Sequence, residues 1–130
     1  MESKNNRSFV SWTRLKKSFY YASQGIAYTW KNEQNFRIHT SAAVVVFVAA
    51  QLLNVSAAEQ ALLAVSIGAV LCLELLNTSI EHITDLIIQT FDERAKIIKD
   101  TAAGAVLVFS ATAAVVGMII FIPRIVHILF

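Results

Sequence analysis

The chain has 130 residues, of which 56% are hydrophobic and only 15% charged, so it is long enough for one domain and too apolar for an ordinary soluble one. Its net charge of +2 is too small to indicate nucleic-acid binding, and its single cysteine excludes a disulfide within the chain. With one proline, four glycines and no alternation of apolar and polar residues, the sequence favours long helices over strands. We therefore predict an all-α integral membrane protein that forms a single domain.

The first predicted element is an amphipathic helix at about residues 8–34. Its basic residues fall on one face, and apolar residues recur on another at steps of three and four, namely Trp12, Leu15, Phe19, Ala22, Ile26 and Trp30. Such a helix lies in the membrane interface, with its rings toward the acyl chains and its cations toward anionic head groups. Taken alone, it is as consistent with a simple anchor as with a functional element. No apolar segment typical of a signal peptide precedes it.

Three later stretches are apolar enough to cross a bilayer, which takes roughly 20 residues of helix. They cover about residues 38–56, 57–90 and 100–122, and the last ends at a helix breaker, Pro123. Seven of the eleven basic residues precede the first span, three lie between the second and third, and one follows the third. The positive-inside rule therefore predicts a multi-pass protein of the cytoplasmic membrane, with the N-terminus and second loop in the cytoplasm and the C-terminus outside.

The second span carries a polar stripe in the stretch "LELLNTSIEHITDLI", residues 73–87. On a helix, Glu74, Asn77, Glu81 and Asp85 lie nearly one above another, with Glu74 deepest in the membrane and Asp85 near cytoplasmic water. Carboxylates inside a membrane are costly and indicate a functional site. Two other interpretations are polar residues that only hydrogen-bond helices together, and a path for protons or ions.

Residues on both sides of this span complement the stripe. Glu33 lies where the interfacial helix turns into the first span and offers a further carboxylate. Lys99 and Asp100 come just before the third span, where we expect the free N–H groups of a helix start to favour phosphate. Carboxylates and amides suit Mg²⁺ with nucleotide phosphates, and a lysine suits a transferring phosphoryl group. Without a Walker A or other Gly-rich loop, the residues alone predict a membrane site for a metal and an anion.

Three segments allow a more specific prediction, because together they resemble the small prokaryotic diacylglycerol kinase family. These are "ELLNTSIEHITDLI", the preceding "WKNEQNFR", and the "KD" that begins fourteen residues after the last Asp of the stripe. The resemblance extends from about residue 14 to residue 122, and "NFRIH" and "AKIIKDTAAGAV" are similar to its Gram-positive, undecaprenol kinase-like branch. His39 stands where the enterobacterial, diacylglycerol-specific branch has an acid, and Gln24 where that branch has a lysine.

The resemblance implies an ATP-dependent kinase that phosphorylates a lipid alcohol from the inner leaflet, using Mg²⁺ with ATP as co-substrate. The implied alcohol is undecaprenol, which would yield undecaprenyl phosphate, and diacylglycerol is the alternative. The resemblance also implies a homotrimer with shared active sites, and the small residues of "SATAAVVG" in the third span would let helices pack closely. A proton- or ion-conducting oligomer is the alternative from another class; it explains the acids but not the cationic loop nearby.

Roles on the stripe follow from the resemblance residue by residue. Glu74 corresponds to the catalytic base that takes the proton from the lipid hydroxyl. Glu33 and Glu81 correspond to the pair that binds the metal of Mg-ATP. Asn77 corresponds to an amide that orients the base or the substrate.

The remaining roles concern the nucleotide and the N-terminal helix. Lys99 corresponds to a phosphate-binding lysine, and Asp85 and Asp100 would help to place the nucleotide. Arg14 and Trp30 match the N-terminal pattern of the family, which implies substrate contacts or support of the site.

Overall fold

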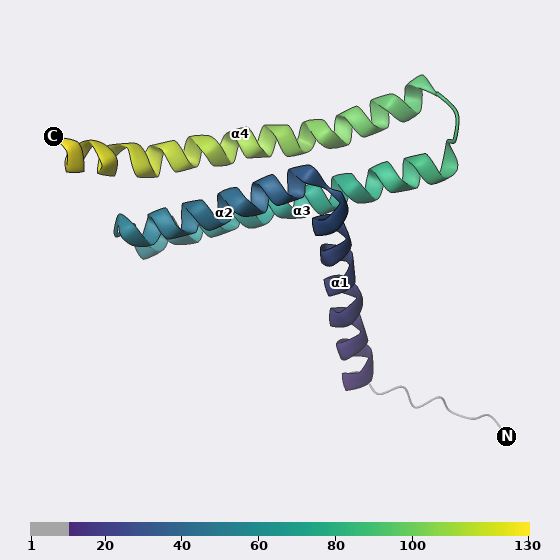
Figure 1. The fold of residues 1–130 in the computed structure, drawn as a ribbon, viewed down its shortest axis with the longest axis horizontal. Coiled ribbons are helices and arrows are strands. Elements are labelled where there is room, and N and C mark those ends of the chain that lie inside the picture. The colour runs from purple at the N-terminus through teal and green to yellow at the C-terminus, as the bar shows by residue number, and fades with distance from the viewer. Residues whose placement is uncertain (1–10) are drawn as a thin grey trace. The chain divides into compact units, whose positions relative to one another are not determined.

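The computed structural model describes residues 11–130, and this part of the chain is helical apart from short connections. Its elements are α1 (Trp12–Asn32), α2 (Gln34–Leu52), α3 (Ala57–Ile87) and α4 (Glu93–Leu129) (Figure 1). The chain divides into two units, of which the first contains α1 and the second runs from Glu33 to Phe130. The predicted all-α class is confirmed.

Helix α1 is amphipathic, and its large apolar side chains, including Trp12, Phe19 and Ile26, are exposed. Lys31 lies in its last turn, where a positive charge interacts favourably with the helix dipole. The helix ends at Asn32, whose side-chain amide donates a hydrogen bond to the carbonyl of Tyr28 at 2.8 Å. Residues 8–10 of the predicted interfacial helix lie outside the described residues.

In the second unit, the chain runs through α2, α3 and α4 as successive antiparallel helices, and α3 packs against both of the others (Figure 1). All three helices are long and apolar enough to cross a membrane. Many of their large apolar side chains are exposed, for example Phe47, Leu107 and Ile119. Exposed apolar faces of this kind are expected where the surrounding solvent is lipid.

The turn between α2 and α3 is fixed by local hydrogen bonds. Asn54 adopts a left-handed conformation with a φ of 47°, which asparagine tolerates better than most residues. Ser56 then caps α3 through a capping box with Glu59. Glu59 also pairs with Arg124 of α4 at 2.6 Å, and the buried core at this end consists of Ala50, Val55, Leu63 and Ile120.

The helices are longer or shorter than the predicted spans because apolar composition does not mark a helix end. Helix α2 begins at Gln34 rather than at about 38, and α3 ends at Ile87 rather than at about 90. Helix α4 begins at Glu93 rather than at about 100, because the Asp92 side chain caps it by accepting a bond from the backbone N–H of Arg94 at 2.8 Å. It also continues through Pro123, so the prediction that this residue ends the helix is wrong.

A candidate active site along the polar stripe

Helix α3 brings the predicted polar stripe onto one face. Glu74 and Asn77 are buried, with 3% and 8% of their surface exposed, although both lie in a helix whose apolar side chains are largely exposed. The amide nitrogen of Asn77 donates a hydrogen bond to Oε1 of Glu81 at 2.8 Å, one turn further along. Two neighbouring members of the stripe, Asn77 and Glu81, are therefore bonded directly.

Helix α2 supplies the partner of the buried carboxylate. Nε2 of His39 lies 3.2 Å from Oε1 of Glu74, within hydrogen-bonding distance. The charges of Glu33 and Glu81 also act on Glu74, so both carboxylates belong to the same electrostatic neighbourhood. Glu33 immediately precedes α2 and makes no side-chain bond to cap it, so capping does not engage its carboxylate.

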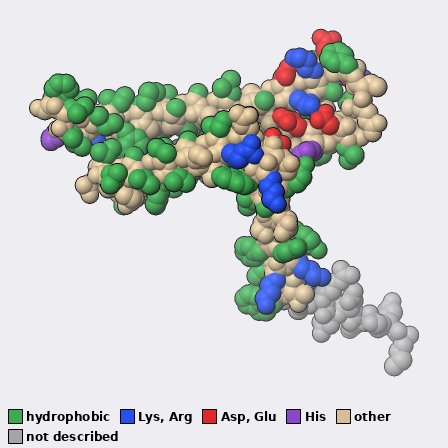
Figure 2. Space-filling model, viewed as in Figure 1, with side chains coloured by type: hydrophobic (Ala, Val, Ile, Leu, Met, Phe, Trp, Pro, Cys, Tyr) green, Lys and Arg blue, Asp and Glu red, His purple; other side chains and the backbone are tan. Residues whose placement is uncertain are grey.

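The first turns of α4 carry the cationic part of the site. Nζ of Lys99 lies 2.9 and 3.1 Å from the two carboxylate oxygens of Asp85, and its charge also interacts with Glu81. Asp100 pairs instead with Lys96 on its own helix. In Figure 2, acidic and basic side chains of the second unit gather at this end, whereas apolar side chains cover most of its length.

One part of the predicted phosphate site is wrong. Lys99 and Asp100 do not stand before a helix start, because α4 begins at Glu93 and they lie within it. The backbone N–H groups around Lys99 are therefore used inside the helix, and the unpaired ones belong to its first turn. Any contact of Lys99 with a phosphate would come from its ammonium group.

A polar cavity of about 220 Å³ lies beside the stripe. Its walls come from all three helices and consist of Asn35, His39, Glu74, Asn77, Ala103, Val106, Leu107 and Ser110. Two buried polar atoms of this wall, Oδ1 of Asn77 and Oγ of Ser110, have no hydrogen-bond partner among the described residues. Buried polar atoms are nearly always bonded, so this cavity has the character of a site for a polar ligand group.

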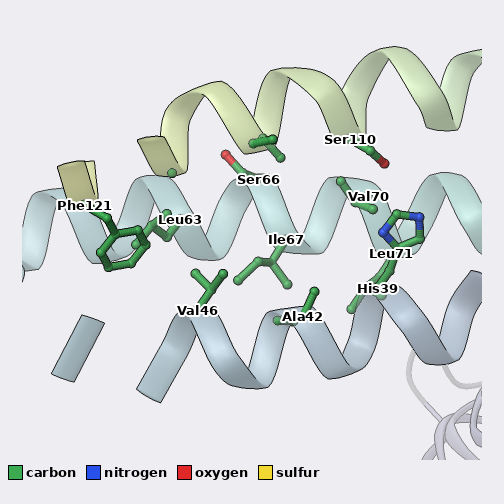
Figure 3. A pocket seen from close by; sticks show the side chains of 14 residues that line it. His39, Ala42, Val46, Leu63, Ser66, Ile67, Val70, Leu71, Ser110 and Phe121 are labelled. Atoms are coloured by element: carbon green, nitrogen blue, oxygen red, sulfur yellow. The ribbon is translucent and has the colours of Figure 1, made fainter. Parts of the chain in front are cut away.

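A second cavity of about 300 Å³ runs between the same helices and is lined almost entirely by apolar side chains (Figure 3). Small residues of α2 and α4 form much of its wall, including Ala42, Ala113 and Gly117. Figure 3 shows His39 and Ser110 near one end and Phe121 at the other. His39 and Ser110 line both cavities, so one end of the apolar cavity lies beside the cavity that Glu74 borders.

The donor chemistry fits a hard divalent cation. Across residues 11–130, no three His, Cys, Asp or Glu side chains come together as a metal site. Glu33 and Glu81 nevertheless flank Glu74, and two carboxylates are what Mg²⁺ takes from a protein when nucleotide phosphates complete its shell. The residues present therefore fit magnesium held jointly with a nucleotide.

Sequence comparison relates the chain to known proteins. A sequence model of the family described as prokaryotic diacylglycerol kinase matches residues 20–121, which include the stripe, Glu33 and Lys99. The chain belongs to the prokaryotic diacylglycerol kinase family. Its membership confirms the resemblance seen in the three sequence segments, and it identifies the protein as a membrane lipid kinase.

Relatives in this family are named for different substrates. The chain is 41% identical to the undecaprenol kinase of Bacillus subtilis, over 95% of this chain and 99% of that protein. It is 46% identical to a diacylglycerol kinase of Synechocystis, over 82% of this chain and 61% of that longer protein. It is also 32% identical to the diacylglycerol kinase of Escherichia coli K12, over 85% of this chain and 91% of that protein.

The structure brings together most of the predicted site residues. Glu33, Glu74, Asn77 and Glu81 form one neighbourhood, and Lys99 reaches it through Asp85 and Glu81. Asp100 interacts with Lys96 instead. Arg14 and Trp30 lie on α1 in the first unit, so their roles stay predictions.

Two residues of the site were not predicted from the sequence. His39 was noted only as a departure from one branch, although an ionisable residue in an apolar span is itself a signal of function. Ser110 lies in a run of small residues that is typical of close helix packing, so the sequence carries no signal that it would border a polar cavity.

Proposed function

We propose that this protein transfers the γ-phosphoryl group of ATP to undecaprenol and so produces undecaprenyl phosphate. The similarity to an undecaprenol kinase over 95% of the chain supports this choice of substrate. The observation that carries the proposal is the position of Glu74, a buried carboxylate beside a polar cavity that shares His39 and Ser110 with the lining of an adjacent apolar one. A lipid alcohol has the same two parts, a hydroxyl and a long apolar chain.

In the proposed mechanism, the part of the apolar chain next to the hydroxyl lies in the larger cavity, and the hydroxyl reaches Glu74. The Glu74 carboxylate accepts the hydroxyl proton while the alcohol oxygen forms its bond to the γ-phosphorus. The bond between that phosphorus and the bridging oxygen of ADP breaks, and ADP leaves with the electron pair. Asn77 orients the base or the substrate. Its amide nitrogen already bonds Glu81, and its amide oxygen has no partner among the described residues.

Lys99 is proposed to bind the phosphates by exchanging its present partner. Its ion pair with Asp85 is partly exposed, with side chains 35% and 62% accessible. Exposed ion pairs contribute only about 0–1 kcal/mol, so replacing one carboxylate by a phosphate costs little. Asp85 and Asp100 would then help to hold the nucleotide from the cytoplasmic side.

Glu33 and Glu81 are the residues that would hold Mg²⁺. When bound with ATP, the ion neutralises charge on the phosphates as the phosphoryl group is transferred. The Glu33 side chain makes no capping bond to α2, and Glu81 is already aligned by Asn77, so both are suited to this role.

The proposal also covers where the protein lies in the cell and how many chains it assembles. The protein would be a multi-pass protein of the cytoplasmic membrane, with the α3–α4 connection facing the ATP-containing side. It would form a homotrimer in which neighbouring chains share sites, with Arg14 and Trp30 contributing substrate contacts. The exposed apolar and small residues of α4 support close packing between copies.

The test is phosphoryl transfer by the purified protein. Radiolabelled ATP is incubated with the protein and either undecaprenol or diacylglycerol in mixed micelles, and the lipid products are separated. We expect label in undecaprenyl phosphate at a higher kcat/KM than in phosphatidic acid; the reverse order would make diacylglycerol the substrate, as the names of two relatives suggest. No labelled lipid, together with ion current in the absence of nucleotide, would support the conducting oligomer instead.

A further inference from the structure

The contact between His39 and Glu74 joins two spanning helices at the buried end of the stripe. The distance is 3.2 Å, and the Glu74 side chain is only 4% exposed whereas that of His39 is 26% exposed. A buried carboxylate is costly unless another group bonds it, and the adjacent charges of Glu33 and Glu81 add repulsion. His39 supplies a donor to this carboxylate from another helix.

The contact also limits how Glu74 can meet a substrate. A glutamate side chain has several rotatable bonds, and a catalytic carboxylate must be held in a productive geometry. Because Oε1 is engaged by His39, Oε2 is the oxygen left for a substrate hydroxyl. The imidazole thus fixes which carboxylate oxygen acts and from which side it is approached.

The position of His39 relates this contact to the lipid path. His39 of α2 and Ser110 of α4 lie near the same end of the apolar cavity (Figure 3). Both residues also line the polar cavity that holds Glu74, and Oγ of Ser110 is buried without a partner among the described residues. A chain lying in the apolar cavity would therefore present its hydroxyl beside His39.

We propose that His39 is a positioning residue for phosphoryl transfer, which holds Glu74 through Oε1 and directs Oε2 toward the hydroxyl arriving from the apolar cavity. This inference rests on the proposed lipid kinase function. It goes beyond that function because it assigns the geometry of the base to a residue of a different helix.

The competing explanation is that His39 only stabilises helix packing. Removing the partner of a buried charge is destabilising in itself, so loss of activity alone does not separate the two explanations. Kinetic constants do, because a positioning residue affects turnover of the bound complex, whereas a packing residue affects the amount of folded protein.

The experiment compares His39→Gln and His39→Leu with wild type, and His127→Gln serves as the matched control. His127 lies in the last turn of α4, outside both cavities. For each purified protein, kcat and KM are measured for ATP and for undecaprenol, along with the midpoint of thermal unfolding. We expect His39→Leu to lower kcat about 10²-fold, the cost of misplacing a catalytic group, while KM for ATP stays near wild type. His39→Gln retains an N–H donor and should recover much of the lost kcat.

Each outcome decides the question. Wild-type kcat in both His39 variants, or a rise in the undecaprenol KM alone, overturns the positioning role. If His39→Leu does not fold, His39→Ala, which also lacks the donor, takes its place: a lower kcat at unchanged unfolding midpoint supports positioning, and wild-type kcat overturns it. If wild-type protein phosphorylates no lipid alcohol, the proposed function fails and this inference with it, which is distinct from failure of the variants alone.

Discussion

Glu74 is the residue whose surroundings are hardest to explain by packing. It is 3% exposed in a helix that buries few large side chains, it contacts a histidine from another helix, and two further carboxylates act on it. An apolar residue there would avoid the cost of burying a charge among like charges. Since this acid lies beside a cavity whose wall has buried polar atoms without a partner in residues 11–130, chemistry accounts for this residue better than stability does.

The first prediction concerns the base itself. Glu74→Gln keeps the size and helix propensity of the side chain but removes the proton acceptor. We expect turnover to fall by about 10²- to 10⁴-fold, the usual contribution of a positioned general base, with nucleotide affinity and assembly near wild type. Nucleotide binding and phosphoryl transfer should be measured on the same preparation. Turnover within a few-fold of wild type would remove Glu74 from the proposed mechanism.

The second prediction concerns the two carboxylates that flank the base. Glu33→Gln and Glu81→Gln should each raise the Mg²⁺ concentration needed for half-maximal activity, by about 10- to 100-fold if they support metal binding. Glu93→Gln is a suitable control because Glu93 lies at the same end, in the exposed first turn of α4. The idea is contradicted if the Mg²⁺ dependence of both site variants matches that of the control.

Much of the site could be predicted at this scale, but not all of it. The stripe follows from spacings of three and four along one helix, so Glu74, Asn77 and Glu81 could be assigned to one face directly. The contact between His39 and Glu74 depends on how α2 packs against α3, which local spacing does not specify. The start of the apolar span predicts a helix start at Lys99, whereas the cap at Asp92 determines where α4 begins.

At the scale of the elements, the position at which α4 begins matters because the first turns of this helix place Lys99 beside Asp85 of the stripe. The carboxylate of Asp92 accepts bonds from the backbone N–H of Arg94 at 2.8 Å and from its guanidinium at 3.0 Å. These bonds lower the pKa of Asp92 from 3.8 to about 2. The first turn of α4 is thus stabilised by the charge of the Asp92 carboxylate, which is accessible to water.

The third prediction follows from that lowered pKa. A carboxyl group with a lower pKa in the folded state stabilises it fully above the unfolded value, here 3.8, and the contribution is lost as the pH falls through about 2. Hydrogen exchange of the amides of residues 93–96, corrected for intrinsic rates, should show loosening between about pH 4 and 2. Asp92→Asn keeps a capping oxygen without the charge and should lose this pH dependence. An equal pH dependence in wild type and variant would contradict the assignment.

At the scale of the whole molecule, the sequence predicts an all-α protein with three membrane-spanning helices, and the described residues agree. Composition was sufficient for this because helices satisfy their own backbone hydrogen bonds in lipid. The arrangement of the first unit relative to the second could not be predicted, since an interfacial helix has no fixed partner in its own periodicity. Whether Arg14 of α1 and Glu74 of α3 act in one site is therefore a question about assembly.

The last prediction tests assembly by mixing two impaired variants. If each site combines Arg14 of one protomer with Glu74 of its neighbour, randomly mixed trimers of Arg14→Ala and Glu74→Gln chains regain sites with both native residues. With equal amounts of each variant, about one quarter of the sites are restored, because each of two independent positions is native half of the time. Glu74→Gln mixed with Glu81→Gln is the matched control, since both changes lie on α3 of one chain and no mixing repairs that helix. Activity should be assayed after subunit exchange has been verified with differently tagged chains. Exchange without recovery in the Arg14 and Glu74 mixture would mean that a single chain supplies both residues.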